Sequence, residues 1–102
     1  MQITRVSIDN LTAMFEALQL DTKIIQQYFH TELADDVPAK AGYALGGRSR
    51  IVKHLRRDDH THIATTHELI TPAGDRVHFH AKDILIGEIK FVAQGEPKLG
   101  RL

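Results

Sequence analysis

Histidine is the residue type whose number and spacing suggest chemistry in this chain. The sequence holds seven histidines, and five of them lie within residues 60–80. An imidazole titrates near neutral pH, binds metal ions and transfers protons, so a group of them can serve several kinds of site. His60 with His62, and His78 with His80, are spaced two residues apart, which places each pair on one face of a strand. Glu68 lies between the pairs and adds a carboxylate.

A turn between the two pairs predicts how they are aligned. Residues 71–75, TPAGD, are typical of a three-residue hairpin loop that pairs Thr71 with Asp75. Continued pairing places Glu68 opposite His78. It also places His67 opposite Phe79, on the core side of the hairpin. The predicted core face holds Ile63, Leu69, Val77, Phe79 and Ala81, and the predicted polar face holds His62, Thr66, Glu68, His78, His80 and Lys82.

Three interpretations of the polar face stay open. The first is a zinc, manganese or iron site, because imidazoles and a carboxylate are the ligands that these metals take. The second is a pH-sensitive interface with a partner or a second copy, which protonation of the imidazoles would weaken. The third, and the ordinary one, is a polar face of a sheet in contact with solvent. The residues concerned are His60, His62, Glu68, His78 and His80.

His67 is a separate case, because its predicted position beside Phe79 is apolar. A histidine there is either a hydrogen-bonded core residue or a polar group directed into an apolar pocket, as small-molecule sites use. If the protein catalyses a reaction, we expect proton transfer or hydrolysis by this residue. His54 is a similar candidate, although the residues after Arg57 do not determine which face it takes. The sequence identifies no catalytic set beyond these candidates.

Composition excludes several classes of site. The chain has 102 residues and no cysteine, which predicts one domain without disulfides, thiol nucleophiles or thiolate metal sites. Neither serine, Ser7 or Ser49, lies in a nucleophile-elbow pattern, and no phosphate-binding glycine motif is present. We expect no cofactor. No apolar run approaches the length that spans a membrane and the first residues do not resemble a secretory signal, so we expect a cytoplasmic protein.

The charges balance at 13 basic and 13 acidic residues, but they are not evenly distributed. Residues 1–40 are net acidic, whereas five basic residues fall within residues 48–57. This strip is too short to predict a nucleic-acid partner, and a solvated edge strand explains it.

The elements that position these residues are predicted from hydrophobic periodicity. Residues 2–8 predict a short strand or an extended lead-in. Leu11, Met14, Phe15 and Leu18 predict a helix that Asp9 or Asn10 caps. A second stripe over residues 24–34 predicts another helix, and residues 38–47 predict a loop. The remainder alternates as strands over residues 48–57, 60–71, 76–82 and 84–93. We therefore expect one α+β domain over residues 1–102, with two N-terminal helices packed on a curved antiparallel sheet of about four strands.

This order of elements resembles the NTF2-like superfamily, which includes SnoaL-type and ketosteroid-isomerase-like proteins. The strings that are similar to the family are FEALQLDTKIIQQYFHTELADDV at residues 15–37, GGRSRIVKHL at 46–55 and FVAQGEPKLGRL at 91–102. The resemblance implies a pocket between helices and sheet, and a homodimer formed through the outer face of the sheet. The pocket residues that it implies are Tyr28, Tyr43, His54 and His67.

Together these observations favour a protein that binds a small apolar molecule in a pocket between helices and sheet. The alternative is a non-enzymatic interaction module that dimerises or binds a protein through its sheet. A histidine-based metal site is the third possibility.

Overall fold

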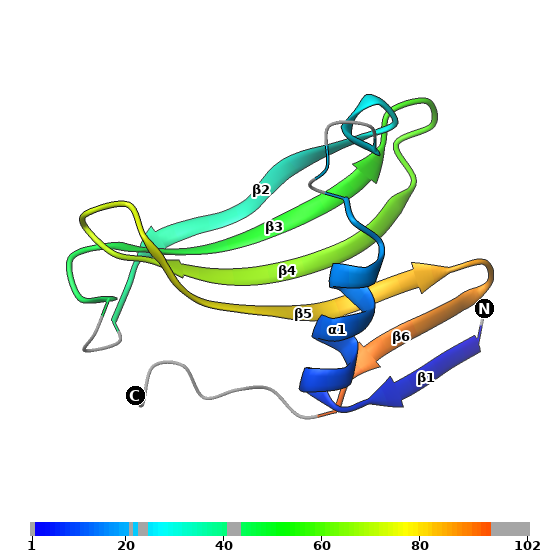
Figure 1. Ribbon diagram of the computed structural model, residues 1–102, viewed down its shortest axis with the longest axis horizontal. Helices are drawn as coiled ribbons and strands as arrows, with labels where there is room; N and C mark the ends of the chain where they lie inside the picture. The colour runs from blue at the N-terminus through cyan, green and yellow to red at the C-terminus, as the bar shows by residue number, and fades with distance from the viewer. Residues whose placement is uncertain (1, 21, 23–24, 41–43, 95–102) are drawn as a thin grey trace.

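The computed structural model describes residues 2–20, 22, 25–40 and 44–94. It consists mainly of one curved sheet with a single α-helix against one face (Figure 1). The elements in chain order are β1 (Gln2–Val6), α1 (Ile8–Ala17), a 3₁₀ turn η1 (Ile25–Gln27), β2 (Phe29–Pro38), β3 (Arg48–Arg56), β4 (His62–Ile70), β5 (Arg76–Ile86) and β6 (Ile89–Ala93).

The six strands lie in the order β1-β6-β5-β4-β3-β2. All neighbouring pairs are antiparallel except β1 and β6, which are parallel. The expected fold of two helices on about four strands is therefore wrong: the described residues contain one α-helix and a six-stranded mixed sheet. No helix among these residues is long and apolar enough to cross a membrane.

The predicted second helix is replaced by η1 and the edge strand β2. The apolar residues within residues 24–34 also fit a strand with one apolar side. In the structure Tyr28 and Leu33 are 64% and 57% exposed, so they do not form the buried stripe that a second helix would need. β2 pairs with β3 from Phe29↔Arg56 to Pro38↔Arg48. Without β2, β3 would have an unpaired row of backbone groups, which a helix over the same residues could not satisfy. Long-range pairing therefore overrides the local periodicity.

The predicted three-residue loop is present, but the pairing shifts two residues beyond it. Thr71 N donates to Asp75 O at 2.9 Å, and Ile70 pairs with Arg76 as expected. Leu69 then pairs with His78 instead of Val77, because a β-bulge leaves Val77 without a partner on β4. A second bulge inserts Lys82 as an extra residue of β5 between the pairs Thr66↔Ala81 and Thr65↔Asp83. Both extra residues belong to β5, and bulges of this kind bend a strand.

The first bulge exchanges the two faces of β4 relative to those of β5. Glu68 now pairs with Phe79, and Thr66 pairs with Ala81. Directly opposed residues in a sheet project to the same side, so Thr66 and Glu68 share a face with Phe79 and Ala81. His67 pairs with His80 and takes the other face. The predictions that His67 lies beside Phe79, and that Glu68 lies on one face with His78 and His80, are therefore wrong.

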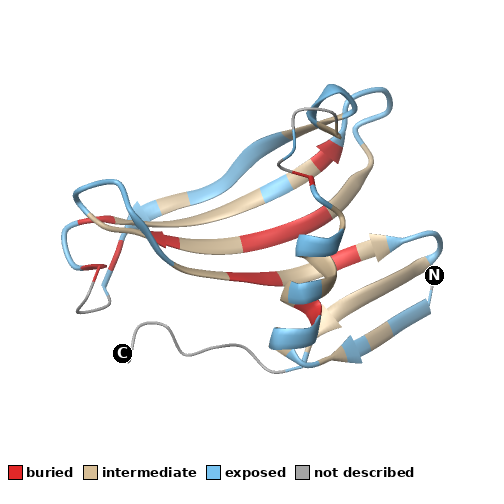
Figure 2. Cartoon of the chain, viewed as in Figure 1, coloured by how far each residue is buried: buried red, intermediate tan, exposed pale blue. Residues whose placement is uncertain are grey.

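Helix α1 lies across β5 and β6, and its docking depends on small residues beneath it (Figure 2). Ser7 caps the helix by accepting from Asn10 N at 3.2 Å, so the cap precedes the predicted Asp9 and Asn10. Leu11 is fully buried against Ala64, Ala81 and Ile84. The next residue of α1, Thr12, also contacts β5: its Oγ1 accepts a hydrogen bond from Ala81 N at 3.0 Å. That N–H lies directly before the second bulge, where the strand ladder is interrupted.

Replacement of Thr12 by valine tests this docking. Valine has the shape of threonine but cannot accept the Ala81 N–H, which lies in a fully buried residue. We expect the free energy of unfolding to fall by about 1–3 kcal/mol in urea denaturation, the cost of an unsatisfied buried donor. Thr31→Val is the control, because Thr31 is exposed on β2 and a surface change of this kind alters stability by about 0.5 kcal/mol or less. Equal stabilities of the two variants would contradict this role of Thr12.

Candidate ligand-binding site

A cavity of about 790 Å³ lies on the face of the sheet that carries α1. Its floor comes from β3, β4 and β5, and its sides come from the end of α1 and from β2. Three phenylalanine rings, three aliphatic side chains, five charged side chains and two histidines are among the groups that line it. The lining residues are Phe15, Glu16, Leu20, Gln26, Phe29, His30, Thr31, Leu33, Arg50, Val52, His54, Arg57, Thr66, Glu68, Arg76 and Phe79. This volume is in the range of cavities that hold small organic ligands.

Cross-strand pairing arranges the floor in rows. One row crosses the sheet through Asp36, Arg50, Glu68 and Phe79, which are successive partners on β2, β3, β4 and β5. The next row along β3 has Val52 opposite Thr66, and the one after it has His54 opposite Ala64. Of these three rows only the first is charged, and Glu16, Arg57 and Arg76 add charged groups to the lining from outside the rows.

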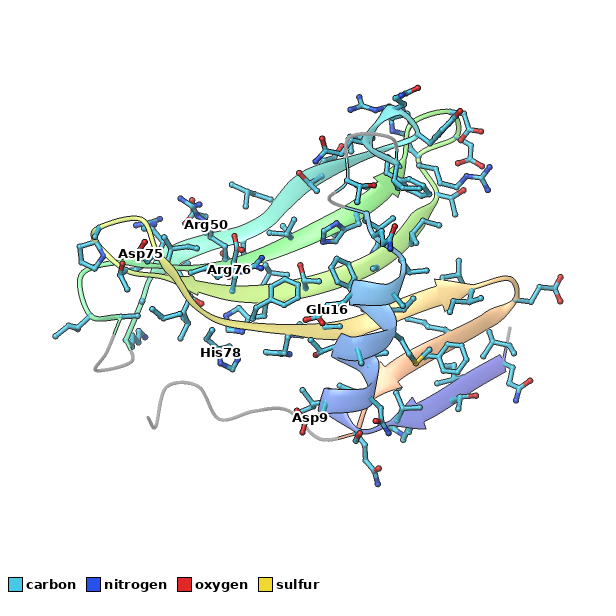
Figure 3. All side chains as sticks on the ribbon, viewed as in Figure 1. Asp9, Glu16, Arg50, Asp75, Arg76 and His78 are labelled. Carbon is cyan, nitrogen blue, oxygen red and sulfur yellow. The ribbon has the colours of Figure 1, made fainter. Side chains whose placement is uncertain are left out.

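At the charged end, Asp36 and Glu68 each contact arginine. Arg48 Nε donates to Asp36 Oδ1 at 2.8 Å, and this hydrogen bond lowers the pKa of the Asp36 carboxyl. Arg50 Nε lies 3.5 Å from the same oxygen. Arg76 Nη1 lies 3.7 Å from Glu68 Oε2, and its guanidinium lies 4.2 Å above the centre of the Phe79 ring. Figure 3 shows Arg50 and Arg76 side by side in this view, whereas His78 points to the other side of β5.

Beyond this row the cavity is lined by Phe15, Phe79 and His54, with the charged side chains of Glu16 and Arg57 also in the lining. The Phe15 ring lies 4.8 Å from the His54 ring and 5.5 Å from the Phe79 ring, so the helix closes the cavity over β3 and β5. His54 Nε2 hydrogen-bonds with Thr66 Oγ1 at 3.0 Å. Burial lowers the pKa of His54 to about 4, with a smaller contribution from His62, and the imidazole is therefore neutral at neutral pH.

His67 belongs to a hydrogen-bond chain on the opposite face of the sheet. Its Nε2 lies 2.8 Å from Ser49 Oγ, and its Nδ1 lies 3.3 Å from His80 Nε2. His80 Nδ1 lies 3.2 Å from the carbonyl oxygen of Ala81, which can only accept. With both imidazoles neutral, the protons therefore run from Ser49 to His67, from His67 to His80, and from His80 to the carbonyl. These hydrogen bonds lie on the face of the sheet away from the cavity, so His67 does not line the cavity.

Of the other predicted histidines, His78 joins the pair His67 and His80, with its ring centre 5.2 Å from that of His80 and 6.4 Å from that of His67. His60 and His62 have other neighbours. His60 lies in the β3–β4 turn with a positive φ of 59°, and its ring meets His30 edge-on at 5.5 Å. His62 lies 2.7 Å from Thr65 Oγ1 and 3.7 Å from Asp83 Oδ1. Burial lowers the pKa of His78, whose Nε2 has no hydrogen-bond partner among the described residues. Within the described part of the chain, no group of three or more His, Asp or Glu residues could hold a metal ion.

Of the four predicted pocket residues, one lies in the cavity. His54 lines it, as expected. Tyr28 instead lies beside a smaller hollow together with Arg56 and Ile63. Tyr43 lies outside the described residues.

Sequence reasoning missed the arginines of the cavity. Residues 48–57 were expected as a solvated edge strand, but β2 covers the edge of β3 and the alternation of β3 directs Arg50, Val52 and His54 to one face. The spacing of these three residues was a usable signal. Arg76 takes the same face because it pairs with Ile70, two residues from Glu68, and the bulge at Val77 then brings Phe79 to that face as well.

Comparisons with protein-family models, with curated proteins and with solved structures found no match to this chain. The resemblance to the NTF2-like superfamily stays a prediction. The segment that was expected as the family's opening helices, residues 15–37, contains the end of α1, η1 and most of β2.

The neutral His54 makes stability depend on pH in a defined direction. The folded protein holds this imidazole unprotonated down to about pH 4, whereas the unfolded chain protonates it near its ordinary pKa of 6.5. The free energy of unfolding therefore falls as the pH falls from 6.5 toward 4. Urea denaturation at pH 7.5 and 5.0 should show a smaller loss for His54→Gln, which does not titrate. Equal losses in the two proteins would contradict the buried neutral imidazole, since His78 titrates in both.

Proposed function

We propose that this protein binds a small, largely apolar molecule in the cavity between α1 and the sheet. The observation that carries the proposal is that α1 lies over β5 and β6 and leaves a hollow over β3 and β4, to which Phe15, Phe29, Leu33 and Val52 present apolar surface. Leu33 at the side of this space is more than half exposed. A concave surface of this size with apolar groups and a few polar ones is the usual form of a small-molecule site.

The lining supports a ligand with apolar surface. Phe15, Phe29 and Phe79 offer faces or edges of aromatic rings, and Val52 and Leu33 offer aliphatic surface. Removing apolar area from water contributes about 25 cal/mol per Å², so a ligand that covers these groups gains affinity from its own surface and from theirs. His54 is neutral and is hydrogen-bonded to Thr66, so this end of the cavity holds no buried charge that an apolar group would have to desolvate.

A residue that fills the cavity should abolish binding. Val52 projects from the middle of the floor, and Val52→Trp replaces ligand volume with an indole ring without adding charge. The probe is N-phenyl-1-naphthylamine, a neutral aromatic amine whose fluorescence rises in apolar surroundings. We expect a saturable rise with the natural protein and an affinity reduced by about tenfold or more in Val52→Trp.

The matched control is Lys53→Trp. Lys53 is the next residue of β3, is exposed, and projects to the opposite face of the sheet. This variant should bind the probe as the natural protein does. Equal binding by the natural protein and both variants would locate the probe elsewhere and contradict the proposal, as would no saturable binding by the natural protein.

The other expectations from the sequence stay predictions. A homodimer through the sheet, and a non-enzymatic role as an interaction module, are not favoured by a specific contact within the described residues. The same holds for catalytic turnover in the cavity.

A further inference from the structure

Beyond the cavity, we infer that Ser49, His67 and His80 form a serine–histidine–histidine catalytic triad that hydrolyses activated carboxylic esters. The three side chains lie on the face of the sheet opposite to α1, the side to which His78 points in Figure 3. The site is therefore separate from the cavity, and its activity does not require a ligand there.

The ring atoms of the two histidines face in the order that an activated nucleophile requires. Ser49 Oγ lies 2.8 Å from Nε2 of His67, and Nδ1 of His67 lies 3.3 Å from Nε2 of His80. Nδ1 of His80 donates to the carbonyl oxygen of Ala81 at 3.2 Å, so its Nε2 carries a lone pair and accepts from His67. With both rings neutral, Nε2 of His67 then holds the lone pair that accepts the serine proton. A base oriented by a third group in this way activates a serine hydroxyl.

Burial is graded along the triad as these roles require. His80 is 4% exposed, and its ring meets that of His78 edge-on with their centres 5.2 Å apart. Ser49 and His67 are partly exposed. The positioning residue is therefore held inside the protein, whereas the nucleophile and the base can meet a substrate.

The bulge at Val77 assembles the triad from three strands. It brings His80 of β5 opposite His67 of β4. Ser49 of β3 is the cross-strand partner of Leu69, so it reaches His67 diagonally along the same face. All three members thus lie on paired strands, which hold catalytic groups more precisely than loops do.

The surroundings of Ser49 indicate the class of substrate. Val37 and Leu69 are its cross-strand partners, and Ile51 follows it on the same face of β3, so apolar surface lies around the hydroxyl. The backbone of Ser49 belongs to the ladder between β2 and β4, so its N–H group donates within the sheet and not to an oxyanion. An aryl ester, whose leaving group is stable, needs less oxyanion stabilisation than an amide. The class that fits is an activated ester with a small apolar acyl group.

The reaction has two halves. Ser49 Oγ attacks the carbonyl carbon of the ester as its proton passes to His67 Nε2. The bond from that carbon to the leaving oxygen then breaks, and the leaving oxygen takes the proton from His67, which gives an acyl-serine and an alcohol or phenol. In the second half, water attacks the acyl carbon and gives a proton to His67, which returns it to Ser49 Oγ as the carboxylic acid departs.

A biotinylated fluorophosphonate tests the nucleophile. Ser49 Oγ bonds to its phosphorus, fluoride leaves, and the serine proton passes to His67. Peptide mapping by mass spectrometry should find the label on Ser49 of the natural protein. Ser49→Ala and His67→Asn should lose the label, whereas Ser7→Ala should keep it. Absence of label from Ser49 of the natural protein, or equal labelling of Ser7, would overturn the triad whether or not the variants fold.

Hydrolysis of 4-nitrophenyl acetate at pH 7.5 tests the base. His67→Asn should lower kcat/KM about 100-fold or more, the usual contribution of a general base. His60→Asn is the matched control, because His60 is exposed in the β3–β4 turn, and it should stay within about twofold of the natural protein. Equal losses in these two variants would assign the hydrolysis to ordinary surface imidazoles and overturn the triad.

Two substitutions of His80 test its positioning role. His80→Gln keeps an acceptor for Nδ1–H of His67, whereas His80→Leu removes it and leaves a side chain that suits a buried position. We expect kcat to fall about tenfold or more in His80→Leu with KM nearly unchanged, and His80→Gln to recover most of this loss. Equal kcat values in the two variants would overturn the assignment of His80. The proposed ligand-binding function of the cavity stands or falls independently of these results.

Discussion

The arrangement of the site depends on a single inserted residue in β5. The β-bulge at Val77 shifts the pairing of β4 and β5 by one position immediately after a correctly formed three-residue loop. Because side chains alternate along a strand, this one position decides which β5 side chains share a face with the β4 residues between the two bulges, Thr66 to Leu69. Thr66 and Glu68 therefore line the cavity with Phe79, and His67 joins Ser49 and His80 on the other face. Glu68, which would be costly beside an aromatic floor, is near Arg76 because Ile70 and Arg76 pair before the bulge.

The second constraint is the short helix. Leu11 and Thr12 dock α1 on β5, where Ala64 and Ala81 beneath it are small enough for close approach. Ten residues of helix cannot cover six strands, so the face of β3 and β4 extends beyond it. In many folds a second helix would fill that space. Here the chain continues instead into η1 and β2, which lengthen the sheet and supply a side wall in Phe29 and Leu33.

These two constraints produce a cavity with different ends. The helix brings Phe15 to His54 at one end, and the desolvation that lowers the pKa of His54 keeps this imidazole neutral. The row through Asp36, Arg50 and Glu68 concentrates charge at the other end. The histidines, the most unusual feature of the composition, are divided between the two faces of the sheet. His54 and His30 line the cavity. His67, His78 and His80 lie together on the other face, and His62 hydrogen-bonds with Thr65.

The sequence by itself determined the local features that short-range physics controls. These include the helix stripe of Leu11, Met14, Phe15 and Leu18, the hairpin loop at residues 71–75 and the strand pattern after residue 47. It could not decide between helix and strand for residues 29–38, because a one-sided apolar stripe fits both and the unpaired edge of β3 decides. Nor could it locate the bulge, since neighbours in β4 such as Leu69 with Ile70, and His67 with Glu68, have similar polarity and favour neither register. Only the tertiary structure decided which side chains share a face, because that depends on contacts with α1 and with neighbouring strands that the local sequence does not encode.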